Sequence, residues 1–175
     1  MFIFTGKFDW LSYSSNDTIT IVAPGVIDTN QPIWGFWQWT ADASGRSKPN
    51  AVATRVYTGK LDWFEKAQNE MVTLILPSGL GLNAPVTLIF QWTQDTDGTK
   101  KAPYAINSSL RAYNVDQDGT VKATVKEYNM QGEVGYYIFS VEFAKDGKEM
   151  KLGMKNPGGD VDSKAPYKLT LSASP

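Results

Sequence analysis

The alternation of apolar and polar positions predicts β-strands along most of the chain. The segments TITIVAP (residues 18–24) and MVTLILP (residues 71–77) place apolar residues at every second position and are rich in β-branched side chains. This period of two is typical of a strand with one buried face. Asp-Gly pairs at residues 97–98, 118–119 and 146–147 favour hairpin turns. No segment has the 3.6-residue periodicity of an amphipathic helix, so we expect an antiparallel all-β fold of about eleven strands.

A second pattern is a repeat of 53 residues. Phe4–Pro49 aligns with Tyr57–Ala102 without a gap, and 16 of the 46 aligned pairs are identical. KAPY also occurs twice, at Lys101–Tyr104 and Lys164–Tyr167, which indicates a divergent third unit. A repeat of this kind predicts one supersecondary unit used more than once. We therefore divide a single β domain of residues 1–175 into units of residues 4–56, 57–112 and 113–175.

The repeat limits the architectures that fit. Two β units, each with one apolar face, can bury these faces against each other in an antiparallel β-sandwich or in a closed barrel. Three units of four strands would instead form a β-trefoil. We expect the sandwich or the barrel, because the third unit is only weakly marked in the sequence.

The chain contains six tryptophans, and the repeat separates them by expected role. Alternate positions of PIWGFWQWT (residues 32–40) have apolar counterparts in the second unit, so this face is expected to be core. Three tryptophans belong to that face, namely Trp37, Trp39 and Trp92. Trp10 and Trp63 occupy equal positions in the two units and are also expected to pack inside.

Trp34 lies on the opposite face of the same segment, and its counterpart in the second unit is Thr87. A Trp beside polar side chains can form a sugar-binding platform, because the ring stacks on a pyranose while amides and carboxylates bind its hydroxyls. The alternative is a Trp that closes the end of the core. The predicted ligand site comprises Trp34, Asp28, Asn30, Gln31 and Gln38.

The composition argues against several classes of function. The chain has 17 Lys plus Arg, 18 Asp plus Glu, and neither His nor Cys. Near-zero net charge disfavours nucleic acid as a partner. The missing His and Cys remove Ser-His-Asp and Cys-His catalysis, ordinary zinc sites and disulfides. The pairs Lys7 with Asp9 and Lys60 with Asp62 are expected to be solvated ion pairs, so the sequence favours a protein without enzymatic activity.

One loop matches part of a calcium-binding motif. Asn114, Asp116 and Asp118 alternate ahead of Gly119, like the first oxygen ligands of an EF-hand loop. The position of the bidentate Glu is occupied by Val125. Since Asp-Gly is also a turn signal, we expect no cofactor, and calcium at these three residues is the alternative.

The stretch NDTITIVAPG at Asn16–Gly25 resembles the strand and turn that open the soluble bacterial calcium-dependent galactose lectins. TGKLDW followed by VTLIL resembles a later strand pair of theirs. Those lectins hold calcium and sugar with a Tyr after the first stretch and an Asp-Thr-Asn-Asn set on a late loop. Neither has a counterpart here after Gly25 or after Phe90, so no site residue is transferred.

These observations predict a non-enzymatic binding module with a carbohydrate as its ligand. Two alternatives are a membrane-surface protein of the cytolysin type, using Trp34 and Tyr136-Tyr137, and a barrel carrier or cyclase-like protein with a small hydrophobic ligand. No run of about 18 apolar residues occurs, so no transmembrane segment is expected. The first residues lack the features of a Sec signal, which predicts a cytoplasmic protein or release without that signal. Exposed edges of duplicated β units also allow a homo-oligomer.

Overall fold

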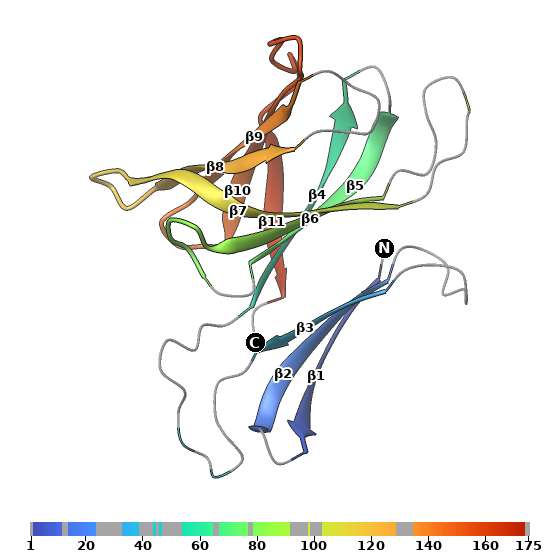
Figure 1. Ribbon diagram of the computed structural model, residues 1–175, viewed down its shortest axis with the longest axis vertical. Coiled ribbons are helices and arrows are strands. Elements are labelled where there is room, and N and C mark those ends of the chain that lie inside the picture. Colours follow the sequence, from blue (N-terminus) through green and yellow to red (C-terminus); the bar gives the residue numbers. More distant parts are fainter. Residues whose placement is uncertain are drawn as a thin grey trace.

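A computed structural model gives an all-β fold with no helix among the described residues (Figure 1). The residues that the structure describes are 2–11, 14–23, 33–38, 44, 46, 54–64, 67–76, 79–91, 98, 103–128 and 135–173. The described residues therefore include no helix of the length and apolarity needed to cross a membrane. The expected all-β class is confirmed. The eleven strands within the described ranges are β1 (Phe2–Trp10), β2 (Ser14–Ala23), β3 (Trp34–Gln38), β4 (Arg55–Trp63), β5 (Ala67–Leu76), β6 (Pro85–Phe90), β7 (Tyr104–Val115), β8 (Val121–Tyr128), β9 (Tyr137–Phe143), β10 (Glu149–Lys155) and β11 (Tyr167–Ala173).

The strands β4 to β11 form a closed antiparallel barrel. Each strand pairs with the next one in the chain, and β11 returns to pair with β4. Of the architectures considered from the sequence, the closed barrel is the one observed for this part of the chain, rather than the sandwich or the trefoil. The Asp-Gly pairs at residues 118–119 and 146–147 lie in the β7–β8 and β9–β10 turns, where the glycines have φ values of 88° and 69°. Glycine adopts such positive φ values at little cost, so these two turns are as predicted.

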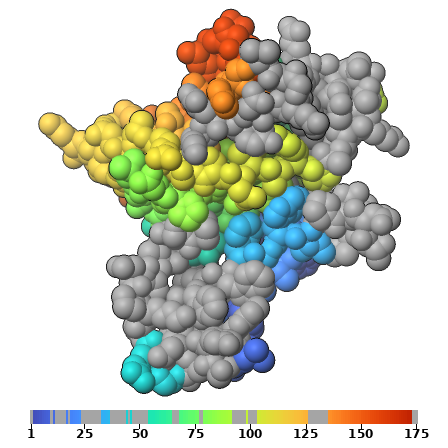
Figure 2. Space-filling view, viewed as in Figure 1, coloured from blue at the N-terminus to red at the C-terminus, as the bar shows by residue number. Residues whose placement is uncertain are grey.

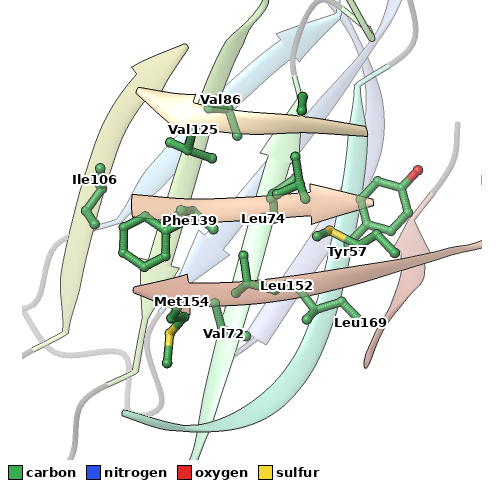
Figure 3. Close-up of a cluster of buried hydrophobic side chains, with 14 of the residues drawn as sticks. Tyr57, Val72, Leu74, Val86, Ile106, Val125, Phe139, Leu152, Met154 and Leu169 are labelled. Atoms are coloured by element: carbon green, nitrogen blue, oxygen red, sulfur yellow. The ribbon is translucent and has the colours of Figure 1, made fainter. Parts of the chain in front are cut away.

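Side chains from all eight barrel strands fill the interior. Figure 3 shows Tyr57, Leu74, Val86 and Phe139 meeting there from β4, β5, β6 and β9. Trp63 is 2% exposed, as predicted for a core Trp. Trp10 lies in β1 and Trp37 in β3, but the side chains of these two residues are not described. Trp39 and Trp92 lie outside the described residues.

The strands β1, β2 and β3 form a separate antiparallel sheet next to the barrel (Figure 1). The bounds of β1 and β2, shifted by 53 residues, are those of β4 and β5. The register shifts by the same number, since Gly6 pairs with Ile19 and Gly59 pairs with Val72, and each hairpin has a bulge before its Trp. The two hairpins thus share one geometry, while the division of the chain into three units stays a prediction.

The three-stranded sheet packs on the outer surface of the barrel. Its contact is a small apolar cluster that contains Ile3, Val22, Trp34 and Phe36 from the sheet. The barrel side of the cluster comprises Val56, Ile75, Ile89 and Ala105. Figure 2 shows the light-blue atoms of β3 directly below the yellow-green atoms at the start of β7. Ile3, Val22 and Phe36 lie 53 positions before Val56, Ile75 and Ile89. The face of the first sheet that contacts the barrel therefore corresponds, in the repeat, to the outer face of the barrel strands β4 to β6.

The face predicted to be core has two different environments. In the second unit, Val86, Leu88 and Phe90 are buried inside the barrel, as predicted. In the first unit, Ile33, which precedes β3 on the same face, is 54% exposed, so the prediction is wrong for this residue. Alternation shows that a strand has one apolar face but cannot show which face meets another sheet. In β3 the opposite face, which carries Trp34 and Phe36, is the one that packs against the barrel.

Candidate functional site

The candidate site is a groove on the outer surface of strands β8, β9 and β10. Its volume is about 520 Å³, which is within the usual range of roughly 300–1,000 Å³ for small-ligand sites. We call it the outer groove. Its floor is formed by Gly153 and by the outward-facing side chains of Lys122, Thr124, Ser140, Glu142 and Lys151, and its wall by Val161, Ala165 and Pro166.

The floor has one charged row across the three strands. Glu142 of β9 pairs in register with Lys122 of β8 on one side and with Lys151 of β10 on the other. The Lys151 Nζ lies 3.0 Å from Glu142 Oε1. The Lys122 Nζ binds Asp116 Oδ2 at 2.6 Å, and this hydrogen bond raises the pKa of Lys122. The row therefore offers one carboxylate acceptor between two ammonium donors.

The next row of the floor carries hydroxyl groups. Thr124, Ser140 and Gly153 lie in register on β8, β9 and β10. A Cβ atom added at Gly153 would collide with the Ser140 side chain. The missing side chain of Gly153 therefore leaves room for the Ser140 hydroxyl in the floor of the groove.

The wall of the groove is a structured turn after β10. Asp160 N donates to Asn156 Oδ1 at 2.9 Å, and Asn156 Nδ2 donates to Asp160 Oδ2 at 3.1 Å. Gly159 lies inside this turn with a φ of 93°, a conformation that favours glycine. Beyond the turn, Val161 bridges to Lys155 in an isolated antiparallel pair. These contacts hold the wall beside the floor.

A polar cluster fixes the far end of the wall to β4. Lys164 Nζ lies 2.5 Å from Asp62 Oδ2, and the Asn69 N–H donates to Asp62 Oδ1 at 2.7 Å. The hydrogen bond from Lys164 holds the pKa of Asp62 below its usual value. The single hydroxyl proton of Tyr167 lies between two acceptors, Asp162 Oδ2 at 2.8 Å and Asp62 O at 2.9 Å from the hydroxyl oxygen. Burial and the hydrogen bond to the Asp162 carboxylate raise the pKa of Tyr167.

The Tyr167 environment predicts a loss of stability at alkaline pH. Because the pKa of Tyr167 is raised in the folded protein, its contribution is full below the unfolded value of about 10 and is lost as the pH rises above it. Tyr167→Phe should lower the melting temperature at neutral pH and flatten its decline above about pH 10. Melting curves recorded across this range test the expectation. The exposed Tyr136 provides the control, since Tyr136→Phe should follow the parent throughout, and an unchanged alkaline slope in Tyr167→Phe would contradict the assignment.

The ligand site predicted from the sequence falls partly within the described residues. Trp34 lies at the start of β3, is partly buried and packs on the sheet–barrel cluster. Gln38 ends the same strand, but its side chain is not described. Asp28, Asn30 and Gln31 lie outside the described residues. The structure therefore gives Trp34 a packing role, and its ligand role stays a prediction.

The loop with the calcium-like spacing is a hairpin turn between β7 and β8. The Asn114 amide donates to Asp116 Oδ1 at 2.9 Å, and the other Asp116 oxygen binds Lys122. Asp118 Oδ1 accepts a hydrogen bond from Thr120 N at 2.9 Å. Among the residues that the structure describes, no group of three or more acidic, His or Cys side chains could hold a metal ion. The carboxylates of this loop thus bind its own backbone and a neighbouring Lys.

The sequence did not point to the outer groove. Its residues come from three strands and a distant wall, and the strand pairing that aligns them is not visible in the chain. Asp62 was expected to pair with Lys60, two residues away, whereas the structure gives it Lys164 as a partner. The repeated KAPY motif, which by itself indicates only a third unit, is a signal that could have drawn attention to this region, since Lys164 to Tyr167 include its anchor and part of its wall.

Comparisons of the chain with protein-family models, with curated proteins and with solved structures found no match.

Proposed function

We propose that the chain is a non-enzymatic binding module that holds a glycan in the outer groove. The observation that carries the proposal is the two-row floor, in which a charged row (Lys122, Glu142, Lys151) lies beside a hydroxyl-bearing row (Thr124, Ser140). Sugar hydroxyls both donate and accept hydrogen bonds, so they match a floor that combines ammonium, carboxylate and hydroxyl groups.

The wall adds an apolar contact to this polar floor. Val161 and Pro166 line the same groove as Ser140 and Glu142, and Val161 is exposed. A pyranose has polar edges and a less polar face, so it can use both parts of the groove at once. The site does not depend on Trp34, whose ring packs at the sheet–barrel contact.

The two alternative functions have less support in the described residues. A small apolar ligand inside the barrel would have to share the interior with the buried side chains that all eight strands place there. For the membrane-surface alternative, Tyr137 is buried and Trp34 is partly buried, which leaves Tyr136 as the exposed member of the three expected aromatic residues. The glycan proposal uses side chains that are already directed outward.

A glycan array with the purified chain tests the proposal, followed by calorimetric titration of the best-bound glycan. Glu142→Gln removes a charged acceptor from the centre of the floor and should weaken binding at least about tenfold, since such hydrogen bonds contribute roughly 1.5–3 kcal/mol. Lys151→Gln should have a similar effect. The recovered glycan should be intact by mass spectrometry, as expected for binding without hydrolysis.

Lys148→Gln is the matched control for Lys151→Gln. Lys148 is an exposed lysine of the β9–β10 turn that does not line the groove, so its replacement should leave the affinity unchanged. An array without a bound glycan, or groove variants that bind as tightly as the parent, would refute the proposal.

A further inference from the structure

A second, smaller hollow of about 240 Å³ lies beside the outer groove, over β9, β10 and β11. We call it the side hollow. Three residues line both the groove and this hollow, namely Glu142, Lys151 and Pro166. The two therefore adjoin along the Glu142–Lys151 pair. Because the side hollow is smaller than the roughly 300–1,000 Å³ of a usual small-ligand site, it suits a further part of a ligand in the groove better than a ligand of its own.

The charged row of the groove floor continues into the side hollow. Lys151 of β10 pairs in register with Lys168 of β11, so the row that begins at Lys122 crosses four adjacent strands. Two lysines opposite each other on neighbouring strands repel, and here each of them has a carboxylate partner. Glu142 Oε1 lies 3.0 Å from Lys151 Nζ, and Glu149 Oε1 lies 2.5 Å from Lys168 Nζ. The Lys168 and Glu149 side chains remain exposed, so both are accessible to a ligand.

The side hollow contains the same kinds of polar group as the outer groove. Lys168 offers ammonium donors, Glu149 a carboxylate acceptor and Thr120 a hydroxyl group. The Thr120 hydroxyl donates to the Asp118 carboxylate, and its oxygen remains an acceptor. Pro166 adds apolar surface to both hollows. Since sugar hydroxyls both donate and accept hydrogen bonds, a second sugar residue in the side hollow would meet the same types of partner as the first one in the groove.

We infer that the ligand is a neutral oligosaccharide of at least two sugar residues, with one residue in the outer groove and the next in the side hollow. This inference rests on the proposed function of the outer groove. A sugar residue that contacts Glu142 and Lys151 in the groove borders the side hollow, because the same two side chains line both. The next residue of its chain can therefore enter the side hollow and contact Lys168 and Glu149.

The balance of charge in the two hollows favours a neutral ligand over an acidic one. Each of the three lysines of the row has a carboxylate within 3.0 Å, which is Asp116 for Lys122, Glu142 for Lys151 and Glu149 for Lys168. An acidic sugar would have to displace one of these carboxylates or lie beside it, and like charges placed together reduce affinity. A neutral sugar can instead bind both members of an ion pair and leave the pair intact.

Calorimetric titration of the full chain with sugars of increasing length tests the inference. The probes are glucose, mannose and N-acetylglucosamine, their linear oligomers, and the monomer and oligomers of the glycan best bound on the array. In a series that binds, the affinity should rise at least about tenfold from the monosaccharide to the oligomer that fills both hollows. It should stay nearly constant between about 50 and about 500 mM salt, because the ligand carries no charge to be screened. A uronic acid oligomer of equal length should bind at least about tenfold more weakly.

Two variants separate the side hollow from the outer groove. Lys168→Gln and Glu149→Gln should each remove most of the affinity that the oligomer gains over the monosaccharide, whereas Glu142→Gln should weaken the binding of both sugars. Lys148→Gln is the control, since Lys148 lines neither hollow and its replacement should preserve the dependence on length. Exposed ion pairs contribute little to stability, so the side-hollow variants should melt at the same temperature as the parent, which shows that they are folded.

The possible results distinguish this inference from the proposed function. A monosaccharide that binds as tightly as its oligomers, or side-hollow variants that keep the full gain with length, would overturn the inference and leave the proposed function in place. Tighter binding of the uronic acid oligomer, with an affinity that falls steeply with salt, would overturn it as well. If none of the probes binds, the proposed function is refuted and the inference with it.

Discussion

Trp63→Ala should destabilise the chain by about 3–5 kcal/mol, a large part of the roughly 5–15 kcal/mol that stabilises a typical domain. Trp63 lies at the end of β4 inside the barrel, with its ring centroid 4.7 Å from that of Phe90 and 5.1 Å from that of Tyr137. Phe139 of β9 lies 5.9 Å away. Removing the indole therefore leaves a cavity between β4, β6 and β9. Urea denaturation measures the resulting loss in the free energy of unfolding.

Trp34→Ala is the comparison for this variant. The Trp34 ring is partly buried and packs on the smaller sheet–barrel cluster, so its loss should reduce the free energy of unfolding less than the loss of Trp63 does. A Trp63→Ala protein that melts within a degree or two of the parent would show that the barrel interior is not packed as described.

Gly59→Ala should destabilise the chain by about 3 kcal/mol, whereas Gly6→Ala should change its stability by less than about 0.5 kcal/mol. The added methyl group at Gly59 would collide with the backbone of Lys168 and with Leu169 of β11. Backbone atoms in a paired strand cannot move aside as a flexible side chain can, so the seam between β4 and β11 must widen. The same methyl group at Gly6 meets no atom within 4 Å.

The glycine pair tests barrel closure because both residues occupy the same place in the repeated motif. Equal stability of the two variants, measured by urea denaturation under the same conditions, would contradict the pairing of β11 with β4. An unfolding slope that matches the parent in both variants would show that the surface exposed on unfolding is unchanged.

The sequence predicted the class of fold because alternation and turn residues are local signals. The strands that contain Ile21 and Leu74 were recognisable by their period of two, and the turns at Gly119 and Gly147 by their Asp-Gly pairs. The different fates of Ile33 and Val86 were not predictable, since the two residues have equal positions in the repeat. The difference is that β8 to β11 cover the inner face of β4 to β6 but not the corresponding face of β1 to β3. Coverage by strands far away in the chain cannot be read from the sequence of the covered strand.

The candidate site was less accessible to sequence reasoning than the fold. Lys122 and Glu142 are 20 positions apart in the chain, Glu142 and Lys151 are 9 apart, and the three become neighbours only through strand register. Trp34 attracted attention because it differs from its counterpart Thr87. The structure offers a packing reason for that difference, since Trp34 fills the sheet–barrel contact while the Thr87 hydroxyl donates to Asn107 Oδ1 at 2.8 Å.

The central claim is that β4 to β11 close into a barrel through the pairing of β11 with β4, whereas the first sheet, which has the same hairpin register as β4 and β5, lies outside this barrel. Amide hydrogen exchange, read by mass spectrometry for peptides of β1 and β4, tests it most directly. We expect the amides of β4 to exchange more slowly than those of β1, because β4 pairs on both sides, whereas β1 pairs with β2 alone among the described strands. Exchange of β4 as fast as that of β1 would contradict the claim.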